Sequence, residues 1–168
     1  GAAKRAYCPQ SPKSGERGKQ TVKQEHVSDN EALLQEIVRN TEMGKNALAQ
    51  LMPYAQDREF RARMLKQQKE YRRLNQKAHT ALAACGAESR GQSTMAKAMA
   101  KAGIKGRTLM DHSTGALAQM LTEGSNQGVM DVVKAQNAYP EASTGAKEMA
   151  DELLRFQEAS AEMYKAYL

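Results

Sequence analysis

Residues 57–85 read DREFRARMLKQQKEYRRLNQKAHTALAAC, and this stretch has the clearest periodic pattern in the 168-residue chain. Mostly apolar side chains recur in it at alternating spacings of four and three residues, which is typical of one buried helix face. That face comprises Phe60, Met64, Gln67, Tyr71, Leu74, Ala78, Leu82 and Cys85. The pattern predicts a helix from about Asp57 to Cys85, with Gly86 as its C-terminal stop.

Three other stretches predict helices of similar length. Ser28 and Glu31 have the spacing of a capping box, before a helix that runs to about Met52 and ends at Pro53. Two further helices are predicted over about 113–139 and 143–168. The inner faces of these three helices are predicted to carry, in chain order, Leu34, Ile37, Val38, Thr41, Leu48 and Met52; Leu117, Leu121, Gly124, Gly128, Val132 and Ala135; and Met149, Leu153, Phe156, Ser160, Met163 and Tyr167.

The links between the predicted helices are short, long and short in chain order. Short links predict two antiparallel hairpins, and the long link fits either a simple up-down order or a ferritin-like crossover. Within the long link, a short helix is predicted over Met95–Ala102, with Gly103 as its stop. We therefore expect residues 28–168 to form one all-α domain, an antiparallel four-helix bundle with a short extra helix between helices two and three.

Composition supports this class and limits the location. The dominant residue types are good helix formers, namely Ala, Met, Leu, Lys, Glu, Gln and Arg. Trp is absent. Residues 1–27 are basic with little that is apolar, so we expect a flexible tail there. No apolar run reaches the ~20 residues of a membrane span, and no signal peptide is recognisable, which predicts a cytoplasmic protein.

The order of the helices resembles an uncharacterised family of bacterial ferritin-like proteins. The resemblance covers about residues 30–168 and is carried by Asn30–Gly86 and Ser113–Leu168, above all by AQMLTEGSNQGVMDVVKA at Ala118–Ala135. The wider superfamily implies a four-helix bundle, often with a carboxylate-bridged di-metal site, and includes iron-storage, oxidase and spore-coat-type members.

A di-metal site of that kind needs inward-facing glutamates and Glu-x-x-His motifs, and this chain has no Glu-x-x-His. The mid-helix glutamates are Glu42, Glu70, Glu123 and Glu158, and their helical phases point away from the predicted inner faces. We therefore expect no metal, no cofactor and no catalytic residues. Only if these phases are wrong would the four glutamates be metal ligands.

Polar residues also fall on or near the predicted inner faces. They are Thr41, Gln67, Tyr71, Asp131 and Ser160. Such residues either form a buried hydrogen-bond network that fixes the helix register or line a small pocket.

Charge is unevenly distributed along the chain. Residues 57–86 carry eight Lys or Arg against three acidic residues, whereas residues 141–168 carry three against six. The basic face of helix two comprises Arg58, Arg61, Lys69, Arg72 and Arg73. This face either complements the acidic fourth helix or binds nucleic acid or another anionic surface. No aromatic residues interleave with it, so base stacking is not indicated.

A second apolar side of helix three is formed by Val129, Met130 and Val133. Either the short connecting helix covers it, or a second subunit does. Three functions remain open: a non-catalytic structural or interaction protein, which we favour and which includes a homo-oligomer formed through this apolar side; a metal-binding protein or oxidase with degenerate ligands; and a nucleic-acid or anionic-surface binder.

Overall fold

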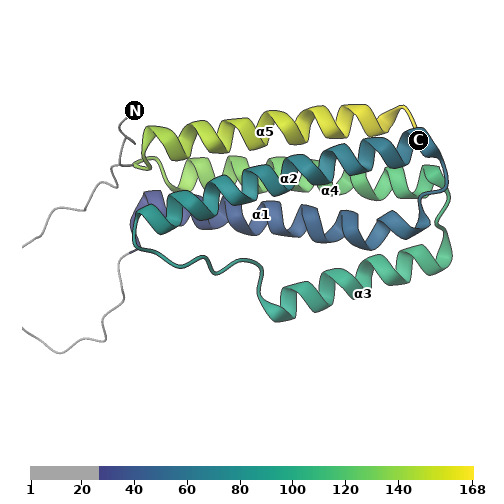
Figure 1. Cartoon of the computed structure of the whole chain (residues 1–168), viewed down its shortest axis with the longest axis horizontal. Helices are drawn as coiled ribbons and strands as arrows, with labels where there is room; N and C mark the ends of the chain where they lie inside the picture. The colour runs from purple at the N-terminus through teal and green to yellow at the C-terminus, as the bar shows by residue number, and fades with distance from the viewer. Residues whose placement is uncertain (1–26) are drawn as a thin grey trace, which may run out of the picture.

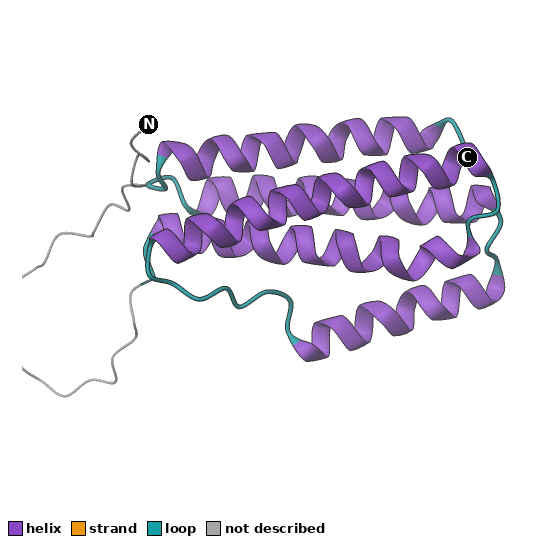
Figure 2. Cartoon of the chain, in the orientation of Figure 1, coloured by secondary structure: helices purple, strands orange, loops and turns teal. Residues whose placement is uncertain are grey.

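The computed structural model describes residues 27–168, and this part of the chain is all-helical with no strand. Its elements are α1 (Asp29–Leu51), the 3-10 turn η1 (Met52–Tyr54), α2 (Arg58–Ala84), α3 (Thr94–Met110), α4 (Thr114–Ala138) and α5 (Thr144–Lys165). Figure 2 shows them as one helical assembly joined by loops. The prediction of an all-α chain is confirmed, while the predicted basic tail lies almost wholly outside the described residues.

Each α-helix begins where a short polar side chain precedes it. Ser28 accepts a hydrogen bond from the Glu31 amide at 3.2 Å, and Asp57 accepts one from the Phe60 amide at 2.7 Å. Ser93, Ser113 and Ser143 cap the other three helices in the same way. These caps satisfy amides that have no partner inside the helix, which is why the four long helices start within a residue of the predicted positions.

The four long helices lie side by side, and α3 runs apart from them along α1 (Figure 1). The main contacts join α1 to α2 and α4 to α5, with further contacts of α1 with α4 and α5. The chain returns along α3 before α4 begins, so α2 and α4 point in the same direction. The link between α2 and α4 therefore runs along the length of the bundle.

The core lies among the four long helices. Its largest fully buried side chains include Phe60, Met64, Leu74, Leu117, Leu153 and Tyr164. On α2 the predicted face is buried from Phe60 to Leu82, and only Cys85 at its end is half-buried. The Phe60 ring packs edge-on against the rings of Tyr164 and Tyr167, at centroid distances of 5.7 and 4.9 Å.

The connecting helix is longer than its predicted span of Met95–Ala102. It continues through Gly103 and Gly106 to Met110, and neither glycine has a positive φ. Glycine weakens a helix by about 1 kcal/mol but stops it only where the backbone turns left-handed. Inward-facing Ile104 and buried Thr108 sit one turn apart and continue the packed face past Gly103.

The predicted inner face of α5 is confirmed in part, since Met149, Leu153 and Ser160 are buried. Gln157 and Tyr164 are buried, whereas Phe156, Met163 and Tyr167 are only half-buried. A strict seven-residue repeat drifts by about 20° per heptad around a straight helix, so the buried face moves off the repeat. Gly124 on α4 is likewise exposed rather than buried.

None of the helices between residue 27 and the C-terminus is long and apolar enough to cross a bilayer.

Replacing Leu153 by alanine should lower the free energy of unfolding by about 2–5 kcal/mol, because this side chain is fully buried in the core. Urea unfolding followed by circular dichroism measures the change. Leu65→Ala is the control, since half of Leu65 is exposed and its loss should change stability by less than about 0.5 kcal/mol. Equal losses in the two variants would contradict the burial of this α5 face.

Candidate functional site: a cavity beneath helix α3

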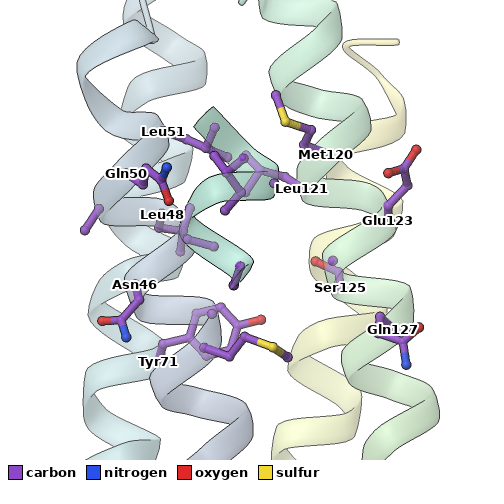
Figure 3. Close-up of a pocket in the computed structure, with 18 of the residues that line it drawn as sticks. Asn46, Leu48, Gln50, Leu51, Tyr71, Met120, Leu121, Glu123, Ser125 and Gln127 are labelled. Atoms are coloured by element: carbon purple, nitrogen blue, oxygen red, sulfur yellow. The ribbon is translucent and has the colours of Figure 1, made fainter. Parts of the chain in front are cut away.

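A cavity of about 780 Å³ lies between α1, α3 and α4. Figure 3 shows Asn46, Leu48 and Leu51 of α1 on one side and Ser125 and Gln127 of α4 on the other. The volume falls within the range of about 300–1,000 Å³ that is usual for small-molecule sites. Helix α3 contacts α1, and only Ala100, Ile104 and Thr108 of this helix are buried or half-buried.

The walls of the cavity are mostly apolar. Its lining from α1 includes Gly44, Ala47, Leu48 and Leu51, that from α3 includes Ala100, Gly103 and Ile104, and that from α4 includes Met120, Leu121 and Gly124. Half of these residues are glycine or alanine, which leaves room between the helices. An apolar molecule would remove this surface from water, which contributes about 25 cal/mol per Å² of apolar area.

A connected set of polar side chains lies deeper, where the cavity reaches α2 and α5. The Gln157 amide nitrogen donates to Asn40 Oδ1 at 2.6 Å and to the Tyr71 hydroxyl at 3.3 Å. Asn40 Nδ2 donates in turn to the Gly128 carbonyl at 3.1 Å. Asn40, Tyr71 and Gln157 are all buried and all line the cavity. Burial raises the pKa of Tyr71, so its hydroxyl remains protonated at neutral pH.

Two glycines let this polar set fit between the helices. A Cβ atom at Gly44 would lie 2.5 Å from Tyr71 Cζ, and one at Gly128 would lie 2.2 Å from Gln157 Nε2. Both distances are shorter than real contacts allow. The Tyr71 ring therefore lies flat against α1, with Phe156 edge-on at 4.9 Å, and the Gln157 amide lies against α4.

Two residues that line this cavity each hold a buried polar atom with no hydrogen-bond partner within the described residues: Ser125 Oγ and Gln157 Oε1. Their side chains are only 2 % and 1 % exposed. A buried polar atom without a partner costs about 1–3 kcal/mol, so such atoms are few in native proteins. Within residues 27–168, Ser125 has neither a histidine nor a carboxylate in hydrogen-bond contact.

Helix α3 is held over the cavity by polar contacts at its two ends and its middle. Lys97 pairs with Glu42 at 2.6 Å, and Arg107 pairs with Glu123 at 2.6 Å. Gln50 Nε2 donates to the Lys101 carbonyl at 2.8 Å. Burial alone would raise the pKa of Glu42, but hydrogen bonds from Lys97 and the Gln92 amide outweigh it and lower that pKa.

The structure also places the other residues singled out from the sequence. Gln67 and Tyr71 are buried and line the cavity. Thr41 and Ser160 are buried elsewhere, and each donates to a carbonyl one turn earlier, Ile37 at 2.8 Å and Phe156 at 2.9 Å. Asp131 is half-buried and accepts from Gln127. The polar residues thus divide between a hydrogen-bonded interior and the cavity.

The four mid-helix glutamates lie on four different helices. Glu42, Glu70 and Glu123 pair with Lys97, Arg73 and Arg107, and Glu158 is exposed. Across residues 27–168, no three His, Cys, Asp or Glu side chains are grouped as a metal site would require.

The basic residues of α2, namely Arg58, Arg61, Lys69, Arg72 and Arg73, are all exposed. Arg73 bonds both Glu70 and Glu152, and these bonds raise its pKa. Lys77 also pairs with Glu152 of α5, at 2.9 Å. Two basic residues of α2 therefore pair with the acidic α5. This agrees with the interpretation that the basic face complements the acidic fourth helix.

The second apolar side of α4 is only partly covered. Val129 is half-buried, but Met130 and Val133 are 49 % and 38 % exposed. Helix α3 therefore does not cover this side. Its own outward residues Met95, Met99, Leu109 and Met110 are exposed as well.

Sequence reasoning missed Asn40, Ser125 and Gln157. Gln157 was placed outside the inner face of α5 because Phe156 fitted the seven-residue repeat. One signal was present in the sequence: Gly128 falls on the inner face of α4, where a missing side chain leaves space for a long one from a neighbouring helix.

No family model, curated protein or solved structure matches this chain.

Gly44→Ala and Gly124→Ala should change stability in opposite directions. The new Cβ at position 44 would strike the Tyr71 ring, which should cost about 1–3 kcal/mol. At position 124 nothing lies within 4 Å, so alanine should stabilise the helix by about 0.5–1 kcal/mol. Urea unfolding of both variants tests this, and a loss at position 124 as large as that at 44 would contradict the packing described.

The contact between Glu42 and Lys97 should make stability depend on pH. The pKa of Glu42 is lowered in the folded state, so its contribution is present above the ordinary value of 4.5 and is lost as pH falls through the folded value. The stability difference between the wild type and Glu42→Gln should therefore shrink as pH falls from 6 to 3. Glu158→Gln, at an exposed position, is the control. A difference that grows toward low pH would contradict the contact.

Proposed function

We propose that this chain is a non-catalytic, ferritin-like four-helix bundle that binds a small, mainly apolar molecule in the cavity between α1, α3 and α4. One observation carries the proposal: a cavity of about 780 Å³ is lined by Ser125 and Gln157, whose buried Oγ and Oε1 atoms no described residue satisfies. An apolar cavity with a few convergent polar groups is the usual form of a small-molecule site.

The ferritin-like part of the proposal rests on the path of the chain. The two hairpins α1–α2 and α4–α5 are joined by a long connection that runs back along the bundle, so α2 and α4 are parallel (Figure 1). One long crossover of this kind is the feature that separates ferritin-like bundles from simple up-down bundles.

The non-catalytic part rests on the residues at the cavity. Its buried polar groups are amides and hydroxyls, namely those of Asn40, Gln67, Tyr71, Gln92, Ser125 and Gln157. None of these is a strong acid or base near neutral pH, and the pKa of Tyr71 is raised further. Such groups orient a bound molecule through hydrogen bonds and supply no proton transfer. The protein would then act through what it holds, as a carrier or a ligand-dependent interaction protein.

The neutral fluorophore N-phenyl-1-naphthylamine tests the proposal, because its emission rises in an apolar site. Gly103 and Gly124 line the cavity from α3 and α4, and a Cβ at either would meet nothing within 4 Å. The double variant Gly103→Leu and Gly124→Leu fills part of the cavity with good helix formers. We expect its affinity for the probe to fall by about tenfold or more, or about 1.4 kcal/mol.

A matched control is available on the same protein. Gly106 and Gly145 also have open space around a Cβ, but neither lines the cavity. The variant Gly106→Leu and Gly145→Leu should bind the probe as the wild type does. Equal weakening in both double variants, or no probe binding by the wild type, would contradict the proposed function.

A further inference from the structure

Asn40, Tyr71 and Gln157 form the floor of the cavity. A backbone carbonyl determines which of their groups donate hydrogen bonds and which accept them. The Gly128 carbonyl can only accept, so the Asn40 side chain must present its nitrogen there, at 3.1 Å. Asn40 Oδ1 then faces Gln157 and accepts from its Nε2 at 2.6 Å. The same Nε2 donates to the Tyr71 hydroxyl at 3.3 Å. Both hydrogens of the Gln157 amide are thereby used. If the amide were turned round, Gln157 Oε1 would face Asn40 Oδ1, and neither oxygen can donate.

What remains at the end of this series is one acceptor and two hydroxyl donors. Gln157 Oε1 is a buried acceptor with no donor among residues 27–168. The Ser125 hydroxyl is unpaired within the same residues, and no described acceptor takes the Tyr71 hydroxyl hydrogen. A molecule that completes these hydrogen bonds must therefore donate to Gln157 Oε1 and accept from the hydroxyl of Ser125 or Tyr71.

The unpaired groups are close enough to bind one head group. Gln157 Oε1 lies 3.0 Å from the position that a Cβ of Gly128 would occupy. Ser125 is three residues before Gly128 on α4, and side chains with this spacing are neighbours about 5–6 Å apart on a helix face. A single polar group of a few atoms fits between them, and the rest of the molecule would extend along the apolar walls.

The charges around the cavity indicate that this head group is neutral. The charged lining residues are Lys97, Lys101, Arg107 and Glu123, and all four are exposed at the rim. Lys97, Arg107 and Glu123 are already used in ion pairs. An ionised group at the buried floor would lose its hydration without a counter-charge, which is costly.

From these contacts we infer that the cavity binds neutral molecules with a hydrocarbon body and a hydroxyl or carboxamide head, which donates to Gln157 Oε1 and accepts from Ser125. The inference rests on the proposed function, and it names the class of ligand for the same site. Alcohols and primary amides share the required chemistry, because both donate and accept at one small uncharged group.

Displacement of N-phenyl-1-naphthylamine from the full chain tests the class with ligands of equal size. 1-Octanol and heptyl methyl ether are isomers, and only the alcohol carries a donor. We expect 1-octanol to displace the probe with about tenfold or higher affinity than the ether, and octanamide to act like the alcohol. Octanoate and octylammonium, ionised at pH 7, should displace it more weakly than 1-octanol.

Ser125→Ala should weaken the binding of 1-octanol by about threefold or more, because the hydroxyl that donates to the oxygen of the head group is lost. This variant keeps the fold, because Ser125 Oγ has no hydrogen bond to lose, and its melting temperature should stay within about 2 °C of the wild type or rise. Ser160→Ala is the matched control. Its hydroxyl bonds the Phe156 carbonyl outside the cavity, so the variant should bind 1-octanol as tightly as the wild type does.

The outcomes separate the ligand class from the proposed function. If the probe binds and both isomers displace it equally, the cavity is merely apolar and the ligand class is wrong. Tighter binding of octanoate or octylammonium overturns the neutral head. An unchanged affinity of Ser125→Ala for 1-octanol overturns the role of Ser125. If the wild type does not bind the probe at all, the proposed function fails and the ligand class falls with it.

Discussion

The carbonyl oxygen of Gly128 can only accept a hydrogen bond, and this constraint orders the polar interior of the protein. It fixes the Asn40 amide, which fixes the Gln157 amide, whose second hydrogen reaches Tyr71. These residues come from α1, α2, α4 and α5, so one series of bonds joins all four long helices. Since a Cβ at Gly128 or Gly44 would displace Gln157 or Tyr71, the two glycines are what allow the series to form.

The same series explains why the interior has an acceptor that no described residue satisfies. The amide nitrogens of Asn40 and Gln157 both donate in the direction of Gly128. The Gln157 oxygen, at the opposite end of the series, therefore has no donor among the described residues. That end faces a cavity because α3 returns the chain along α1 and packs with few residues (Figure 1). The long connection between α2 and α4 therefore also accounts for the cavity. Ion pairs of Glu42 and Glu123 with Lys97 and Arg107 hold α3 over it.

Much of the fold was predictable because its signals are local. The serine and aspartate caps, Pro53 and the α2 face each act within a few residues, so the four long helices were predicted to within about three residues at each end. The length of α3 was missed because a glycine ends a helix only when its φ turns positive, and nothing local to Gly103 decides that. Gln157 was missed because its burial depends on space beside Gly128, on another helix. The cavity depends on how α3 settles on α1, which no single segment encodes.

The central claim is that a small molecule occupies the cavity beneath α3, and methionine methyl resonances test it most directly. Met43 and Met120 line the cavity, whereas Met95 and Met110 are exposed on the outer side of α3. In a titration of methyl-labelled protein with 1-octanol, the account predicts saturable shifts at Met43 and Met120 and none at Met95 and Met110. Shifts confined to Met95 and Met110, or no saturable shift at any of the four, would contradict it.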